Sequence, residues 1–322
     1  MVENQLKTTN NSSPKIAIII PYFGKWPEWI DLFFYSCIQN TEIDWFFFTD
    51  CNISLNIKNL IFKQMTFDEY CSFVSAELDI KFHPVSPYKL CDLKVFYGFI
   101  HRELLVNYDF WGFGDVDVIW GDIRGFYKDD LLEKFDVFST HADRLSGHLA
   151  ILRNNQNLRE TCFKIENWKD QLEHEENFGL DEVDFSTLIY PLSKYIRKFY
   201  GRIIVPFLGW RNGWVLYYSL MPFINTIFRI KSKRLFFKEQ HTTPILSDDG
   251  LSSEHDASNW YYKDGKITND KTNMRYIYLH FMVYKKNRFR TYYYWKDKFY
   301  FLPESFEFSK GVLISKNGIT CN

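Results

Sequence analysis

The sequence predicts an α/β fold in which a mixed, Rossmann-like sheet is flanked by helices. Lys15 to Tyr22 is a short, continuous apolar run with four isoleucines, which is typical of a parallel strand buried on both faces. Helical spacing of apolar residues follows over 30–38, after a proline suited to a first turn, and the apolar run 44–50 predicts a second strand. This β-α-β order is how nucleotide-binding sheets begin.

Later segments alternate in the same way. Thr66 and Glu69 have the spacing of a capping box ahead of a helix, and Ser86-Pro87 predicts the start of another helix that runs to Leu104. We expect strands at 108–114, 136–140 and 148–152, a helix entered near residue 181, a hairpin turn at 263–266 and a late strand at 276–283.

Composition limits the classes of protein that the chain can belong to. A chain of 322 residues, of which 46% are hydrophobic, can bury a large core, so we expect a globular protein with a disordered tail only at residues 1–14. The net charge of −1 gives no reason to expect a nucleic acid as partner. Six scattered cysteines, a polar N-terminus and no apolar run near the roughly 20 residues of a membrane span predict a cytoplasmic protein.

Two carboxylates end the central predicted strand. Asp115 and Asp117 are separated by one valine, so in an extended chain both point to one face, at the edge of the sheet where open α/β folds bind ligands. Hard oxygen donors there suit a divalent cation that carries phosphates. The alternative is that one carboxylate caps a turn and the other pairs with a lysine.

Other candidate groups lie elsewhere in the chain. His280 lies within the expected apolar strand 276–283, which runs into a basic stretch that begins at Lys285. Imidazole can complete a mixed shell for Mn²⁺, although a histidine in such a strand is often a core residue. The acidic run Asp181-Glu182-x-Asp184 is either favourable charge at a helix start or a general base.

Several polar residues remain without a decided role. Residues 141–148 follow a strand end, where donor or acceptor groups could bind. Lys89, Asp92 and Lys94 are either helix-surface charges or part of a donor pocket, and the basic aromatic segments 229–238 and 284–298 are either solvated faces or contacts to an anionic membrane surface.

These motifs together resemble bacterial glycosyltransferases of the GT-A superfamily, over most of the chain from Lys15 onward. Residues 86–94, followed by the segment around Asp115 and Asp117, are similar to uncharacterised proteins of capsule and O-antigen loci. The loop Pro21-Tyr22-Phe23 looks like the first nucleotide-binding loop of that superfamily.

The resemblance implies a ligand and a role for each motif. Asp115 and Asp117 would hold Mn²⁺ or Mg²⁺ on a nucleotide-sugar diphosphate, with His280 as third ligand and Lys285 on the diphosphate, as in the glycogenin-like galactosyltransferase branch. Asp181 and Glu182 would lie beside the sugar. The glycine and Pro-Trp usual after that histidine are absent here, and a glutamate replaces the usual glutamine, which would allow Glu182 to act as a base. With the open donor-pocket candidates Lys89 and Asp92 included, the residues that we expect to bind the donor are Pro21, Tyr22, Phe23, Lys89, Asp92, Asp115 and Lys285.

The resulting expectation is a GT-A-like domain at 15–225 whose active site is completed by a C-terminal extension at 226–322. It would transfer a sugar, from a UDP-sugar in our expectation, to a glycan or a lipid-linked oligosaccharide, at the inner face of the cell membrane if the basic segments bind there. Two other classes stay open: a sugar-phosphate nucleotidyltransferase and a non-catalytic glycan-binding protein.

Overall fold

A seven-stranded mixed sheet forms the centre of the computed structural model, in the order β3-β2-β1-β4-β7-β6-β8. The first four of these strands are mutually parallel, β7 is antiparallel to both β4 and β6, and β8 is parallel to β6. The bounds are Ile16–Pro21 for β1, Ile43–Thr49 for β2, Leu60–Gln64 for β3, Phe110–Gly114 for β4, Val137–Ser139 for β6, Leu149–Arg153 for β7 and Leu235–Phe237 for β8. The predicted mixed, Rossmann-like α/β sheet is thus confirmed.

The structure describes the greater part of the chain, with gaps. The described residues are 13–141, 144–190, 196, 198–209, 212–213, 216–217, 219–220, 235–237, 259–281, 307–315 and 317–321. The predicted tail at 1–14 and the basic segments at 229–238 and 284–298 lie almost wholly outside these ranges. Within them, no helix combines the length and the apolar character that crossing a membrane requires.

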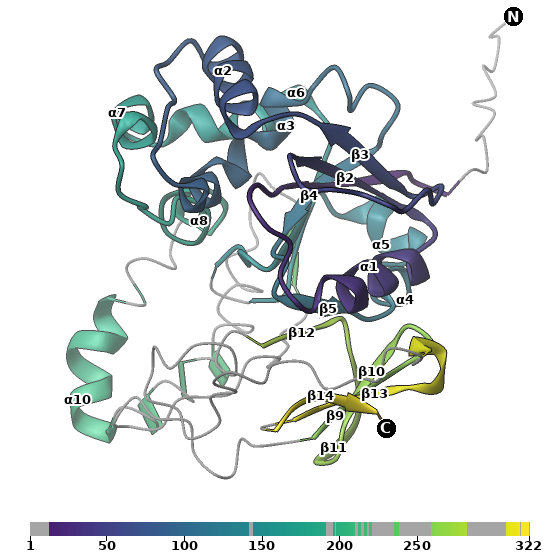
Figure 1. Cartoon of the computed structure of the whole chain (residues 1–322). Helices are drawn as coiled ribbons and strands as arrows, with labels where there is room; N and C mark the ends of the chain where they lie inside the picture. Colours follow the sequence, from purple (N-terminus) through teal and green to yellow (C-terminus); the bar gives the residue numbers. More distant parts are fainter. Residues whose placement is uncertain are drawn as a thin grey trace, which may run out of the picture.

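Side chains alternate along each strand, so both faces of the sheet carry apolar residues, and both are covered. Ala17 and Ile19 of β1 enter one buried cluster, whereas Ile16, Ile18 and Ile20 enter another on the opposite face. Figure 1 shows the two helical layers on either side of the sheet. One layer contains α2 (Phe67–Leu78), α3 (Tyr97–Ile100), α6 (Gln156–Arg159), α7 (Trp168–Glu173) and α8 (Ser186–Ile189), and the other contains α1 (Ile30–Gln39), α4 (Ile123–Phe126) and α5 (Asp129–Lys134).

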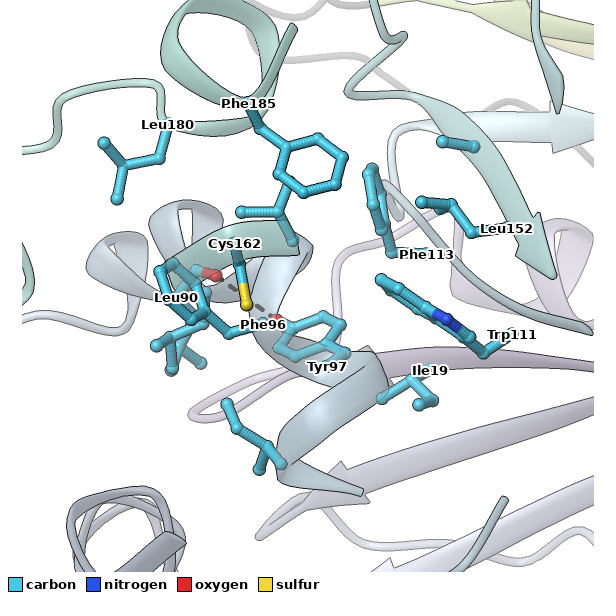
Figure 2. Close-up of a cluster of buried hydrophobic side chains, with 14 of the residues drawn as sticks. Ile19, Leu90, Phe96, Tyr97, Trp111, Phe113, Leu152, Cys162, Leu180 and Phe185 are labelled. Carbon is cyan, nitrogen blue, oxygen red and sulfur yellow. Dashed lines mark hydrogen bonds between the residues drawn. The ribbon is translucent and has the colours of Figure 1, made fainter. Parts of the chain in front are cut away.

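The first of these clusters extends from the sheet to the turns that carry the acidic run (Figure 2). Side chains of β1, β4 and β7 meet those of the segments around residues 96 and 180, and Tyr97 donates a hydrogen bond to the Leu90 carbonyl at 3.2 Å. Leu180 and Phe185, which flank the predicted acidic site, are fully buried in it. The acidic run is therefore held against the same core as the central strands.

A second, five-stranded sheet in the order β11-β10-β9-β13-β14 packs on α1 through a third buried cluster that includes Leu32, Ile119 and Leu279. Its strands are β9 (Trp260–Lys263), β10 (Lys266–Asn269), β11 (Thr272–Tyr276), β13 (Val312–Ser315) and β14 (Gly318–Cys321). The β9–β10 hairpin was predicted, and its turn residues Asp264 and Gly265 both have positive φ, as a type I′ turn requires.

The short strand β12 (Tyr278–His280) connects this C-terminal part to the central one, because it pairs antiparallel with β5 (Val118–Trp120). His280 lies opposite Val118 in that register. The strand predicted at 276–283 is thus divided between β11 and β12, and its last two residues are outside the described ranges.

The helix predicted from Ser86 to Leu104 is wrong in type. Residues Pro87–Phe96 form a 3₁₀ helix, η1, and only α3 is α-helical. Three residues per turn place Lys89 and Asp92 one above the other, and Lys89, Asp92 and Lys94 are 2%, 0% and 7% exposed. Their reading as surface charges is therefore also wrong. The capping box of α2, by contrast, is formed as predicted.

Candidate functional site

The two predicted carboxylates lie at the carboxyl end of β4, in a bend that leads to β5. The expectation of an extended segment is wrong here, because β4 ends at Gly114. The bend is fixed from both sides. The Asp115 N–H donates to the His148 carbonyl at 3.3 Å, and the indole of Trp29 donates to the Val116 carbonyl at 2.7 Å.

Asp115 and Asp117 nevertheless face one cluster of ligating groups. Asp115 Oδ2 lies 3.0 Å from His148 Nδ1, and Asp117 Oδ2 lies 3.4 Å from His280 Nε2. The two imidazole rings contact each other, with centroids 3.7 Å apart and planes inclined by 31°. One ligand atom from each of Asp115, His148 and His280 lies within 4.8 Å of the others, so these groups are close enough to share a metal ion. Asp117 is not one of these three residues, but it contacts the group through His280.

Lys94 joins this cluster to the acidic run. Its ammonium lies 2.5 Å from Asp115 Oδ1 and 3.7 Å from Asp181 Oδ2, and it donates to the Gly147 carbonyl at 3.0 Å. Burial disfavours the charged form of Asp115, but Lys94 and the bond from His148 outweigh it and lower the pKa of Asp115 to about 2. The pairing of one carboxylate with a lysine, foreseen as the alternative, is thus present beside the metal-competent cluster.

Asp181 and Glu182 begin the turn Asp181–Phe185, which has π-helical hydrogen bonding and continues into α8. Burial raises the pKa of Asp181 to about 6, although Lys94 opposes the shift. Glu182 is also desolvated, but the positive charge of Arg144 and the imidazoles of His148 and His141 lower its pKa. At neutral pH Glu182 is therefore an anion, and its Oε1 accepts a hydrogen bond from Gly147 N–H at 3.2 Å.

Lys89 and Asp92 lie beneath the acidic run. They form an ion pair of 2.9 Å, and the carboxylate of Asp92 also accepts hydrogen bonds from the N–H groups of Phe178, Gly179 and Leu180. Lys89 in addition donates to the carbonyls of Gln171 and Glu176. Both side chains thus hold the loop that leads to Asp181.

The predicted nucleotide loop follows β1. Phe23 is buried in the core, whereas Tyr22 is partly exposed and stacks on Trp26 with centroids 5.0 Å apart. Burial raises the pKa of Tyr22, and the charges of Cys51 and Asp117 add to the shift, so the phenol lies within electrostatic reach of the carboxylate cluster. Pro21 ends β1 at the same edge of the sheet.

Two residues of this site, His148 and Lys94, were singled out in the sequence only as parts of undecided segments. The available signal for His148 was its place just before an apolar strand, but the strand order that sets it beside Asp115 is not visible in the sequence. Lys285, the predicted diphosphate contact, and Asp143 lie outside the described residues.

Comparison with known proteins identifies the family but not an activity. A model described as a family of unknown function, DUF6625, matches residues 18–205, which is more than half of the chain. The chain belongs to this family. The matched part of this DUF6625 member includes Asp115, His148 and the acidic run, whereas His280 lies beyond it. No curated protein matches the chain.

Solved structures that align include two of the glycosyltransferase GlyE from Streptococcus pneumoniae TIGR4. The first is 11% identical in sequence, and the alignment covers 57% of this chain and 44% of the GlyE chain, with a TM-score of 0.27. The second, the apo form, is 10% identical and covers 73% of this chain and 67% of its own, also with a TM-score of 0.27. This DUF6625 chain thus spans less than half of the first GlyE chain, and a functional assignment has to rest on the geometry of its own site.

Proposed function

We propose that this chain is a metal-dependent glycosyltransferase that moves a sugar from a nucleotide-diphosphate sugar, a UDP-sugar in our proposal, to a hydroxyl of a glycan or lipid-linked acceptor in surface polysaccharide synthesis. The observation that carries the proposal is the convergence of Asp115, Asp117 and His280 from distant segments, with Asp181 and Glu182 directly across Lys94 and Gly147. Such a site combines ligands for a divalent ion with a separate pair of carboxylates.

In this proposal Asp115, Asp117 and His280 would hold Mn²⁺ or Mg²⁺. The fit is supported by a ligand atom of Asp115 within 4.8 Å of one of His280, and by Asp117 Oδ2, which lies 3.4 Å from His280 Nε2. The ion supplies charge neutralisation for the leaving diphosphate when bound. Tyr22 would lie against the base of the nucleotide, and its stacking on Trp26 supports this role. Basic residues outside the described ranges, Lys285 among them, remain candidates for the diphosphate and for a membrane surface.

Glu182 is the proposed general base. In the transfer, the bond between the sugar C1 and the diphosphate oxygen breaks, a bond from C1 to the acceptor oxygen forms, and the acceptor hydroxyl loses a proton. Glu182 is ionised at neutral pH and can take this proton, whereas Asp181, with its raised pKa and its contact to Lys94, is the better candidate for a hydrogen bond to the sugar.

The test is a panel of nucleotide-sugars incubated with the purified chain and Mn²⁺, in which released nucleoside diphosphate and pyrophosphate are both measured. We expect nucleoside diphosphate, and we expect Asp117→Asn to reduce its release at least a hundredfold with an unchanged melting temperature. Asp122→Asn is the matched control, because Asp122 is exposed, caps α4 through Gly125 N–H and can be replaced in that role by asparagine.

Two outcomes would contradict the proposal. Pyrophosphate released in the presence of a sugar phosphate and a nucleoside triphosphate would indicate a nucleotidyltransferase. Nucleotide affinity that is absent with and without metal, together with binding of oligosaccharides, would indicate a glycan-binding protein.

A further inference from the structure

A second histidine, His148, occupies the metal-competent cluster. It directly precedes β7, which pairs antiparallel with β4, and this pairing brings its backbone carbonyl to the N–H of Asp115. The ring therefore lies over the end of β4, where Nδ1 meets Asp115 Oδ2 at 3.0 Å. The side chain of His148 is 21% exposed, so this edge of the cluster is open to solvent.

The contact between the two histidines is the unusual feature. His280 is 3% exposed, and its ring lies on that of His148 at a centroid distance of 3.7 Å. Two protonated imidazoles at this separation would repel each other. Neutral imidazoles are the form that binds metal ions.

The charge of the cluster also differs from that of a purely acidic site. Asp115 divides its two oxygens between Lys94 and His148, so one negative charge is already compensated by an ammonium. The remaining donors are two ring nitrogens and carboxylate oxygens of Asp115 and Asp117. Mg²⁺ prefers an all-oxygen octahedron and keeps its waters, whereas the affinity of imidazole nitrogen for first-row transition ions rises along the series from Mn²⁺ to Cu²⁺.

We infer that His148, His280 and Asp115, with Asp117 beside His280, form a two-nitrogen, carboxylate-completed centre for a first-row transition ion that discriminates against Mg²⁺. The inference rests on the proposed function for its place in the reaction, because it names the class of ion that the proposed transferase would use. It assigns His148 as a ligand in addition to the residues predicted from the sequence.

The experiment measures metal binding by the full chain without substrate, after removal of metal with a chelator. Mn²⁺ binding is followed by loss of the free-ion paramagnetic resonance signal, Co²⁺ binding by its visible absorption, and Mg²⁺ binding by competition against Mn²⁺. We expect one site that binds Mn²⁺ and Co²⁺ at least about tenfold more tightly than Mg²⁺. Electron spin-echo modulation of bound Mn²⁺ should show coupling to two imidazole nitrogens.

Single substitutions separate the contribution of each histidine. His148→Gln should lower the affinity for Mn²⁺ at least about tenfold and leave the affinity for Mg²⁺ almost unchanged. It should also reduce the nitrogen coupling of bound Mn²⁺ to that of one imidazole ring. His83→Gln is the matched control, because His83 is exposed and does not belong to the cluster. The nitrogen coupling of the unsubstituted protein keeps the inference testable if His148→Gln does not fold.

The results distinguish this inference from the proposed function. Coupling to a single nitrogen, or unchanged Mn²⁺ affinity in His148→Gln, would overturn the inference even if Mn²⁺-dependent release of nucleoside diphosphate were observed. A two-nitrogen centre in a protein that releases no nucleoside diphosphate would support the inference and contradict the proposed function.

Discussion

Gly147 connects the two halves of the site. Its carbonyl accepts a hydrogen bond from Lys94 and its N–H donates to Glu182. A Cβ atom at this position would lie 2.9 Å from Asp181 Oδ2 and 3.1 Å from Glu182 Oε1, which leaves no space for a methyl group unless a carboxylate moves. The observed positions of Asp181 and Glu182 therefore depend on the absence of a side chain at residue 147.

We predict that Gly147→Ala lowers the turnover number of the proposed transfer roughly ten- to hundredfold, because it displaces Asp181 and Glu182 by a fraction of an ångström. Mn²⁺ affinity and melting temperature are the controls, and both should change little. Equal activity of Gly147→Ala and the unsubstituted enzyme would show that these two carboxylates need no fixed position.

His101 is a buried histidine of the core. It is 3% exposed, lies on Phe48 with ring centroids 4.5 Å apart and shares a hydrogen bond of 3.0 Å with the Tyr70 hydroxyl. Burial lowers the pKa of His101 to about 3 from its ordinary value of 6.5. The native protein therefore keeps this ring neutral at pH values where the unfolded chain protonates it.

We predict that the stability contributed by neutral His101 is present above pH 6.5 and is lost as the pH falls from there towards 3. The unfolded state binds one more proton in this window, so His101 reduces the free energy of unfolding by up to about 1.4 kcal/mol per pH unit. Denaturant titrations between pH 7 and pH 4.5 should show a shallower pH dependence in His101→Phe. The exposed-site variant His83→Gln should retain the original slope.

At the scale of elements, the 3₁₀ helix η1 positions the turn that carries Asp181 and Glu182. Lys89 and Asp92 both leave one side of η1 and together bind carbonyls at 171 and 176 and the N–H groups of residues 178–180. A buried ion pair that loses one partner leaves an uncompensated charge. The pair therefore acts on the site through the loop.

We predict that Lys89→Met lowers the free energy of unfolding by about 3–5 kcal/mol and reduces turnover, without a selective rise in KM for the nucleotide-sugar. Lys81→Met, at an exposed lysine, is the control and should change neither quantity. A large rise in donor KM with unchanged stability would instead support a direct contact between Lys89 and the donor, which was one of the two alternatives from the sequence.

At the scale of the whole molecule, the C-terminal part completes the cluster that the central sheet begins. Leu279 is fully buried in the cluster formed with α1 and β5, and the Tyr278 hydroxyl contacts Thr140 Oγ1 at 2.8 Å. The next residue, His280, is thereby set opposite Val118 of β5. Metal affinity should consequently depend on packing at some distance from the ligands.

We predict that Leu279→Ala costs about 2–5 kcal/mol of stability and also weakens Mn²⁺ binding, because it loosens the strand that presents His280. Leu132→Ala is the matched control: Leu132 is equally buried, but it lies in α5, which carries none of the proposed ligands. It should cost similar stability and leave Mn²⁺ affinity unchanged. A parallel loss of affinity in both variants would mean that global stability alone is responsible.

The sequence by itself determined the features that local patterns encode. The isoleucine run of β1, the capping box of α2, the Asp264-Gly265 turn and the position of Asp115 after an apolar strand all follow from periodicity, capping or turn chemistry within a few residues. His280 was also identified, because it lies in an apolar run that leads into a basic stretch.

Only the tertiary structure decided which of these groups meet. His148 reaches Asp115 because β7 runs antiparallel beside β4, and Lys89 meets Asp92 because residues 87–96 adopt three residues per turn. Strand order and helix type depend on packing over the whole chain, and spacing in the sequence does not specify them. The site therefore gained a second imidazole and a buried ammonium that the carboxylate motif alone could not indicate.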